Sequence, residues 1–340
     1  MKLVSRVAKL LLLLGLVLSL FSGGTVYFWW QTVSGAADVE DHQKIKVEIP
    51  KGASATEVGR LLSQSGVIRD PFVFRAASRL RKKSAAIMPG EYTLSKSLTI
   101  DQIYEQLEKG PTDLRLTIPE GWRREQIAVR LGDLVNNRKS GKFDNGTFLA
   151  ITKGLEGKLF PDTYLVPQDA SEDTIVKMML LNFQKKTEKL LDAQLPAGLN
   201  KEGVIVLSSI VERETSGNEN ERAIVAGILL KRLKNNWPLQ TDATLQYIRD
   251  SLIVAKGTVG IKFWQPLTGA EKEIDSPYNT YLYQGIPPMA IANPGLSAIK
   301  AVLSPQDTAY WYYIHGDDGK IHFAQTSNEH QQNITKYLSG

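Results

Sequence analysis

Residues 207–234 read LSSIVERETSGNENERAIVAGILLKRLK, and this stretch decides what kind of core the chain builds. Its apolar side chains recur at helical spacing, and Glu214 comes seven residues after Leu207 and three after Val211. A turn of about 100° per residue places Glu212 on the opposite side of the same helix. If the stretch is helical, Glu214 therefore lies in the middle of its apolar face.

Glu214 would need a reason to lie among apolar side chains, because burying a carboxylate costs free energy and raises its pKa. A carboxylic acid that stays protonated near neutral pH is what a general acid for cleavage of a sugar–sugar bond requires. The alternative is structural: the helix ends near Thr215, and Glu214 reaches water or caps a neighbouring segment. The residues of this stretch leave both interpretations open.

Length, charge and cysteine content exclude several classes of protein. The chain has 340 residues and a net charge of +5, which suits an anionic membrane surface or acidic wall polymers. No nucleic-acid-binding motif accompanies this charge, so nucleic acid is not an expected partner. The absence of cysteine excludes disulfides, thiolate zinc sites and a cysteine nucleophile. The 4 histidines form no HExxH motif, and the sequence predicts neither a metal nor a cofactor.

The N-terminus carries a topological signal. Basic residues precede an uncharged apolar run, Leu10–Trp30, which is long enough to span a bilayer and ends in interfacial aromatic residues. The sequence thus predicts a cytoplasmic tail over residues 1–9, a transmembrane anchor over 10–30 and a linker over 31–44, with the remainder outside the cytoplasm. A cleaved signal peptide is the alternative, and the bulky aromatic end of the run favours the uncleaved anchor.

The order of segments after the linker predicts an α+β fold. Residues 45–112 alternate strand, two short amphipathic helices, strand and helix, which is typical of a small α+β module. Residues 113–150 predict a second small strand–helix unit. Residues 151–340 predict a mixed α/β catalytic domain that closes with an aromatic hairpin around GDDGK and a terminal helix.

One polar loop has side chains of the kind that bind sugars. The segment NNWPLQTDATLQY, residues 235–247, places Gln240, Thr241 and Asp242 close to a tryptophan. An exposed ring can stack on a sugar while amide and carboxylate groups bind its hydroxyls. The alternative is an ordinary helix start with Asp242 as the N-cap.

A second candidate loop is SPYNTYLYQGIPPMAIANPG, residues 276–295, with Tyr278 and Asn279 near its start. Long ordered loops rich in proline and glycine are more often functional than decorative. The alternative is a rigid connection between two elements.

These motifs together resemble those of a known family. An N-terminal anchor followed by LEGKLFPDTY, SSIVERET, LQTDATLQY, SPYNTY, GIPPMAIANPG and a closing aromatic hairpin resembles the endolytic murein transglycosylase family (MltG, also called YceG-like) over nearly the whole chain. The resemblance implies that the module over 45–112 is LysM-like, a peptidoglycan-binding fold. It also implies a lytic transglycosylase that cleaves nascent glycan strands internally, between N-acetylmuramic acid and N-acetylglucosamine, and leaves 1,6-anhydro ends.

The resemblance also assigns roles to residues. The family's catalytic glutamate is the second one of its E-x-E-T motif, which is Glu214 here, and Glu212 would support it. Residues 240–242 and the pair Tyr278 and Asn279 would line the glycan cleft. The implied setting is the inner (plasma) membrane, spanned once, with the catalytic domain on the periplasmic side. The implied partners are peptidoglycan glycan strands and penicillin-binding peptidoglycan synthases.

One carboxyl group suffices for this reaction if the nucleophile belongs to the substrate. By hypothesis, Glu214 protonates the departing glycosidic oxygen and then takes the proton from the C6 hydroxyl of the muramic acid residue. One rival is a glycoside hydrolase that uses Asp242 as a second carboxylate. Another rival is a non-catalytic, anchored wall-binding scaffold that recruits synthases.

Overall fold

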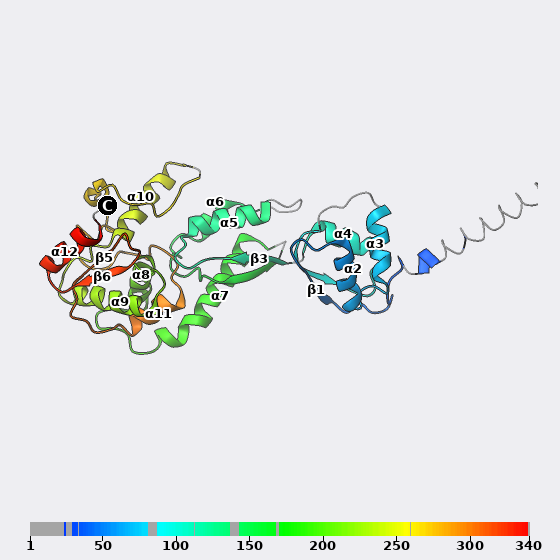
Figure 1. The fold of residues 1–340 in the computed structure, drawn as a ribbon, viewed down its shortest axis with the longest axis horizontal. Coiled ribbons are helices and arrows are strands. Elements are labelled where there is room, and N and C mark those ends of the chain that lie inside the picture. Colours follow the sequence, from blue (N-terminus) through cyan, green and yellow to red (C-terminus); the bar gives the residue numbers. More distant parts are fainter. Residues whose placement is uncertain are drawn as a thin grey trace, which may run out of the picture. The chain divides into compact units, whose positions relative to one another are not determined.

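The computed structural model describes residues 24, 29–32, 34–80, 87–111, 113–136, 143–167, 170–258 and 260–338. The described chain is α+β, as the sequence predicts, and it forms two compact units (Figure 1). No helix in these described ranges is long and apolar enough to cross a membrane. The predicted anchor over Leu10–Trp30 lies almost wholly outside the described residues, and the predicted tail lies outside them altogether.

The first unit is built on one antiparallel strand pair, whose register places Val47 opposite Tyr92. Its elements are β1 (Ile45–Ile49), α2 (Ala55–Gln64), α3 (Pro71–Leu80), β2 (Gly90–Leu94) and α4 (Ile100–Lys109). Ser54 caps α2 by accepting a hydrogen bond from the backbone N–H of Glu57. The inward side chains of all five elements form one apolar core, so this unit has the strand–helix–helix–strand–helix order expected for residues 45–112.

The second unit holds the longer helices and the closing hairpin. In chain order its elements are α5 (Arg124–Asn136), α6 (Asn145–Ile151), α7 (Glu172–Leu191), α8 (Lys201–Arg213), α9 (Glu219–Lys234), α10 (Asp242–Ala255), a 3-10 turn (Ala270–Glu273), α11 (Leu296–Leu303), β5 (Tyr312–His315), β6 (Ile321–Ala324) and α12 (Ser327–Tyr337). A further strand pair, β3 (Asp113–Thr117) and β4 (Thr163–Pro167), is divided between the two units. The domain boundaries expected after residues 112 and 150 stay predictions.

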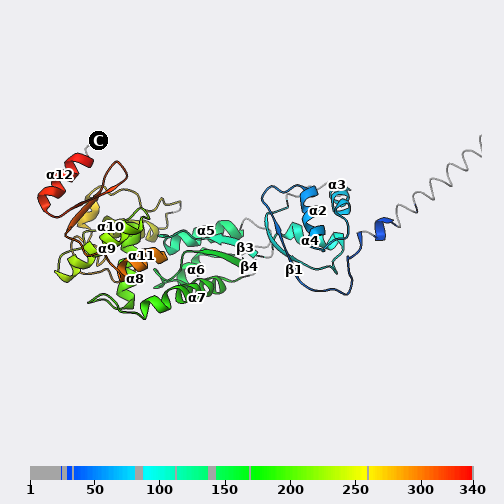
Figure 2. The same ribbon diagram turned by 60° about the horizontal axis from the view of Figure 1, so that its bottom comes forward.

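Helix α8 is the centre of the second unit (Figures 1 and 2). Every residue from Gly203 to Glu212 is buried, and α9, α10 and α11 all pack against this helix. A helix that is apolar on all sides is stable only when it is surrounded in this way. Its fully buried aliphatic side chains, such as Leu207 and Ile210, each contribute about 1.5–3 kcal/mol of burial free energy. Residues 207–234 therefore comprise the second half of this core helix, a short connection and all of α9.

The segment before α11 wraps around α8 and ties it to the loop around residue 157. The backbone N–H of Ile291 donates to Ser209 Oγ at 3.0 Å. The side-chain oxygen of Asn293 accepts from the N–H groups of Gly157 and Leu159, both at 2.9 Å. The end of the proline-rich loop is thus a rigid structural connection, which is one of the two alternatives that the sequence left open.

We expect Gly157→Ala to destabilise the fold more than Gly154→Ala. Both glycines have a left-handed backbone, with φ of +89° and +82°. An added Cβ at Gly157 would lie 2.6 Å from Ala290 Cβ and 2.7 Å from Ile205 Cγ2, whereas nothing lies within 4 Å at Gly154. The strained backbone alone costs about 1–2 kcal/mol, and overpacking at Gly157 adds about 1–3 kcal/mol.

Urea unfolding of both variants and the wild type measures this difference, provided that the slopes agree. Equal midpoints for the two variants would show that the contact of residue 157 with α8 is not tight.

Candidate active site

The carboxyl group of Glu214 is held by two other segments of the second unit. Glu214 directly follows α8 as its C-terminal cap, with φ −93° and ψ 4°, and is 7% exposed. Its Oε1 accepts from the backbone N–H of Ala243 at 3.1 Å, in the first turn of α10. Its Oε2 accepts from the Tyr313 hydroxyl at 2.9 Å, and its backbone carbonyl accepts from His315 Nε2, also at 2.9 Å. Glu214 therefore points inward, as the helical spacing predicts, but α8 ends at Arg213 and the carboxyl group binds the start of a neighbouring helix, as the structural alternative expected.

Burial raises the pKa of Glu214 above its ordinary value. The nearby Asp242 carboxylate adds to this rise in pKa, whereas the Ala243 N–H, His315 and the Tyr313 hydroxyl oppose it because they favour the carboxylate. The group thus holds a proton more readily than a surface glutamate does, yet two donors are in place to bind its carboxylate. A general acid that must later regain its proton needs both properties.

Glu212 lies on the other side of α8 and is also buried, at 8% exposure. Its Oε1 forms an ion pair with Arg222 of α9 at 2.6 Å, and its Oε2 accepts from the N–H of Gly295 at 3.0 Å, at the start of α11. Burial raises the pKa of Glu212, and the positive charge of Arg222 opposes that rise. Glu212 therefore joins three helices behind Glu214.

Glu214 lines a pocket of about 500 Å³, a volume typical of small-ligand sites. The side chains around it are mostly polar or aromatic. They are Glu214, Arg232, Gln240, Asp242, Lys272, Tyr281, Tyr312, Tyr313, Ile314, His315, His330 and Leu338. The pocket is thus built by the end of α8, the start of α10, the segment around residue 281 and the C-terminal hairpin with α12.

Two of the predicted substrate-binding residues lie in this pocket beside Glu214. Gln240 has a left-handed backbone, with φ +50°, and its N–H donates to Thr280 O at 3.0 Å. Such a backbone is costly for a residue other than glycine and persists only where the surroundings hold it. Asp242 Oδ1 accepts from the Tyr281 hydroxyl at 2.6 Å.

The other predicted substrate-binding residues of the two loops, Thr241, Tyr278 and Asn279, are not among the residues that line the pocket. The Thr241 hydroxyl lies 3.1 Å from Thr280 Oγ1 in the buried interior. Asn279 is fully buried and donates to the backbone carbonyls of residues 272 and 274. Tyr278 packs on Tyr247, with ring centroids 5.1 Å apart. These side chains fix the loops from which Gln240, Asp242 and Tyr281 reach the pocket.

Tyr313 and His315 were not recognised as candidates for the site from the sequence. They belong to the hairpin predicted around GDDGK. Their alternation is visible in the sequence, because residues two apart on a strand share a face. Nothing in the sequence indicates that this face meets residue 214, which is about a hundred positions earlier.

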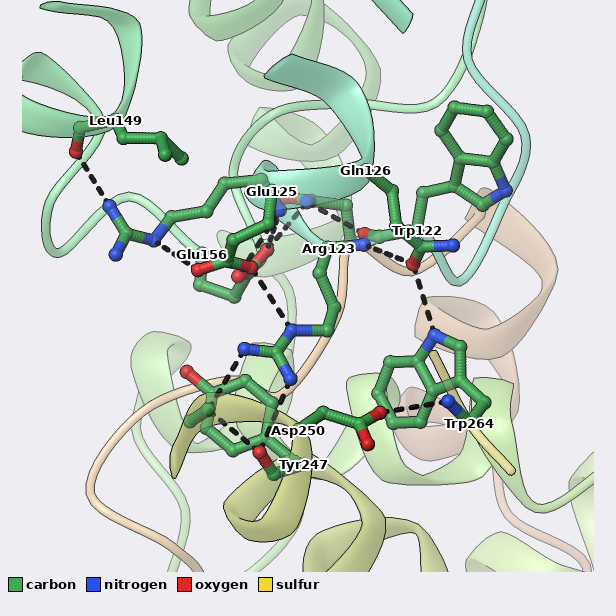
Figure 3. Close-up of polar contacts among 12 residues, drawn as sticks. Trp122, Arg123, Glu125, Gln126, Leu149, Glu156, Tyr247, Asp250 and Trp264 are labelled. Carbon is green, nitrogen blue, oxygen red and sulfur yellow. Dashed lines mark hydrogen bonds and ion pairs between the residues drawn. The ribbon is translucent and has the colours of Figure 1, made fainter. Parts of the chain in front are cut away.

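A buried arginine, Arg123, binds the middle of α10 (Figure 3). Arg123 is 1% exposed and its Nε donates to Glu125 at 3.1 Å. Its other two nitrogens donate to Tyr247 O at 3.2 Å and Ser251 Oγ at 2.9 Å, and its guanidinium lies 4.2 Å from the centre of the Tyr247 ring. Arg123 thus fixes the helix whose N-terminus binds Glu214.

Glu156 lies next to this arginine and is 3% exposed. Its Oε1 accepts from the backbone N–H of Arg124 at 3.1 Å and from Asn293 Nδ2 at 2.7 Å. Burial, helped by the charge of Glu125, raises the pKa of Glu156 to about 8. Glu156 comes from the LEGKLFPDTY motif, where sequence analysis did not mark it as a candidate residue.

The pocket brings together one buried carboxyl group whose pKa is raised, a second carboxylate, and tyrosine and amide groups, an arrangement that suits general acid–base chemistry. Among the described residues, no group of three or more His, Cys, Asp or Glu side chains is arranged to hold a metal ion. The model of the YceG-like family matches residues 47–336, so this chain belongs to the YceG-like family.

Proteins similar to this chain carry a common name. An endolytic murein transglycosylase of Bacillus subtilis is 28% identical, with 93% of this chain and 91% of that protein covered. An endolytic murein transglycosylase of Streptococcus pneumoniae is 27% identical, and the match covers 95% of this chain but 64% of that longer protein. A crystal structure of a YceG-like protein from Listeria monocytogenes matches with a TM-score of 0.54 and 28% identity, over 85% of this chain and 99% of that one.

We expect Glu156→Gln to remove a pH-dependent part of the stability. Because the folded-state pKa of Glu156 is about 8, the folded protein holds a proton there that the unfolded chain has lost above its ordinary pKa near 4.5. The contribution of Glu156 to the unfolding free energy is therefore fully present below about pH 4.5. It is lost as the pH rises to about 8, by at most about 1.4 kcal/mol per pH unit.

Chemical unfolding of the wild type and the variant between pH 5 and 9 measures this contribution. Glu188→Gln is the matched control, since Glu188 is an exposed helical residue of the same unit. Parallel stability–pH curves for the wild type and Glu156→Gln would contradict the assignment.

Proposed function

We propose that this chain is a membrane-anchored lytic transglycosylase of peptidoglycan. In this proposal it cleaves the bond between N-acetylmuramic acid and N-acetylglucosamine inside nascent glycan strands and leaves 1,6-anhydro ends. The observation that carries the proposal is the Glu214 carboxyl group, 7% exposed with a raised pKa, in a pocket lined by polar and aromatic side chains. The shared name of the relatives from two organisms supports it.

The first step is proton transfer from Glu214 to the glycosidic oxygen, which breaks the bond from that oxygen to C1 of the muramic acid residue. The Ala243 N–H and the Tyr313 hydroxyl stabilise the carboxylate that forms, and they need no rearrangement to do so. The position of Ala243 in the first turn of α10 adds the favourable end of the helix dipole.

The second step is attack of the sugar's own C6 hydroxyl on C1, and its proton passes to Glu214. The acid is thereby restored, no water is consumed, and one carboxyl group serves both steps. Intramolecular attack gains from proximity, so the pocket needs only to hold the sugar in a reactive shape. Asp242 would stabilise positive charge that develops at C1, and the Gln240 amide and the Tyr281 hydroxyl would hold the sugar's polar groups.

Glu212, Thr241, Tyr278 and Asn279 serve the site through the backbone in this proposal. Their side chains are bonded to or packed on other parts of the second unit, so they would set the positions of Glu214, Gln240, Asp242 and Tyr281. Their substitution should therefore lower activity together with stability.

The setting of the enzyme is part of the same proposal. The apolar run over residues 10–30 would anchor it once in the inner (plasma) membrane, with the catalytic domain on the periplasmic side. The first unit would be a LysM-like module that contacts glycan strands, and penicillin-binding peptidoglycan synthases would be partners. The basic residues before the run support this orientation.

A two-carboxylate hydrolase is the second candidate, because Asp242 lines the same pocket as Glu214. Hydrolysis adds one water to the products, whereas transglycosylation gives anhydro ends that are lighter by one water. The non-catalytic scaffold that the sequence left open has no such observation in its favour, and it would require no cleavage at all.

We expect Glu214→Gln to lower strand cleavage by about 10²–10⁴-fold, because the amide cannot donate the acidic proton. Glutamine keeps an oxygen for the Ala243 N–H, so the fold should be unchanged. The measurement is mass spectrometry of products from uncrosslinked glycan strands, with the wild type and Glu214→Gln side by side. Asp242→Asn serves as the comparison, because the amide keeps the shape of the side chain.

The transglycosylase is supported if the wild type gives products with 1,6-anhydro ends and Asp242→Asn gives the same products at a lower rate. The hydrolase is favoured if the wild-type products carry one added water and Asp242→Asn gives no product. Full cleavage by Glu214→Gln would eliminate Glu214 as the acid, and no cleavage by any form would leave the scaffold.

A further inference from the structure

The C-terminal hairpin reaches Glu214 with two side chains. Tyr313 and His315 are two residues apart on β5 and therefore share one face of the strand. The Tyr313 hydroxyl contacts Glu214 Oε2 at 2.9 Å, and His315 Nε2 contacts the Glu214 carbonyl oxygen at 2.9 Å. The first contact holds the reacting group and the second holds its backbone.

We propose that Tyr313 and His315 are positioning residues for the acid–base chemistry of Glu214. The hydroxyl of Tyr313 fixes the carboxyl group in the pocket, and the imidazole of His315 fixes the end of α8 that carries it. The catalytic part of this inference rests on the proposed function, whereas the control of Glu214 by the hairpin does not.

Tyr313 can bind both forms of Glu214 because a phenol is both a donor and an acceptor. Burial and the Glu214 carboxylate raise the pKa of Tyr313 well above its ordinary value, so the phenol keeps its proton throughout the working range of pH. It donates to Oε2 when Glu214 is a carboxylate, and it can accept when Glu214 carries the proton. The carboxylate gains more, because hydrogen bonds to charged groups are the stronger ones.

His315 acts on the backbone. A carbonyl oxygen can only accept, so His315 Nε2 must carry the hydrogen in this contact. The last carbonyls of a helix have no partner within it, and this bond supplies one at residue 214. The N–H of Glu214 is bonded to Ile210 O at 2.9 Å, so both backbone groups of the residue are held.

The hairpin itself is fastened to α9. Arg232 is 4% exposed, and two of its nitrogens donate to the carbonyl of Trp311 at 3.0 and 2.6 Å. Trp311 stacks on Trp237 with ring centroids 5.1 Å apart, and Tyr312 stacks on His330 of α12 at 5.1 Å. Tyr313 follows directly from this fixed segment, so its hydroxyl cannot swing away at little cost.

Several charged or polar groups face Glu214, and their effects on it differ in sign. From α10, the Ala243 N–H lowers its pKa and the Asp242 carboxylate raises it. From β5, Tyr313 and His315 lower it, and from α8 the neighbouring Arg213 interacts with it electrostatically. Tyr281 faces it across the pocket and, like Glu214, interacts with Asp242. Removing the Tyr313 hydroxyl leaves all the other groups in place.

The test is Tyr313→Phe, which removes only the hydroxyl. We expect the alkaline limb of the pH–rate profile on uncrosslinked glycan to move up by about one pH unit, because the carboxylate loses a donor. The plateau rate should fall about tenfold, because the same carboxylate forms during bond cleavage. If the substitution only destabilised the fold, the rate would fall but the alkaline limb of the pH–rate profile would not move to higher pH. His315→Ala should lower the plateau rate severalfold.

Tyr310→Phe is the matched control, because Tyr310 precedes the same strand and stacks on Phe323 at 5.3 Å outside the pocket lining. Its profile should overlay the wild type. A Tyr313→Phe limb that overlays the wild type would overturn the role of Tyr313, and a wild-type rate for His315→Ala would overturn that of His315.

Infrared titration reads Glu214 without any substrate. The carbonyl band of the protonated carboxylic acid is identified as the band lost in Glu214→Gln, and its midpoint is compared between the wild type, Tyr313→Phe and Tyr310→Phe. An upward shift in Tyr313→Phe alone supports the inference even if no form cleaves glycan, which would refute the proposed function only. An unchanged midpoint overturns the assignment of Tyr313 whether or not glycan is cleaved.

Discussion

Two glutamate carboxyl groups at the end of the buried helix α8 accept hydrogen bonds from backbone N–H groups at the starts of two other helices. The rest of the second unit depends on this arrangement. Glu212 accepts from Gly295 at the start of α11, and Glu214 accepts from Ala243 at the start of α10. The first N–H groups of a helix have no partner within it, and a carboxylate suits the positive end of the helix dipole. The end of α8 thus fixes where α10 and α11 begin.

The two carboxyl groups nevertheless have different partners, although burial raises the pKa of both. Glu212 faces Arg222 at 2.6 Å, so its negative charge has a buried counterion. Glu214 lines the pocket, and its carboxyl oxygens accept from a backbone N–H and a phenol. One carboxyl group is therefore suited to holding helices together and the other to exchanging a proton. Burial alone does not separate them, since both are within 8% exposure.

A second group of buried polar side chains, Arg123, Glu156 and Asn293, holds α10 and the segment before α11 in place. Arg123 fastens α10 through Tyr247, and Asn293 fastens the segment before α11 to the loop at residue 157. The N-terminal ends of α10 and α11 are therefore bound by α8, while this group binds the middle of α10 and the segment before α11. Rigid support of this kind keeps Asp242 and Glu214 in place without relying on mobile loops.

The sequence by itself determined the local structure and the inward position of Glu214. Helical spacing predicted α8 and the two short amphipathic helices α2 and α3, and the aromatic strands around GDDGK predicted the closing hairpin, because turns and periodicity act over a few residues. The same spacing put Glu212 on the opposite face of the helix. Only the tertiary structure decided that α8 is buried on all sides, that Glu212 pairs with Arg222, and that Tyr313 and His315 meet Glu214 across about a hundred residues. Such contacts depend on how separate elements pack, and no local rule of spacing encodes that packing.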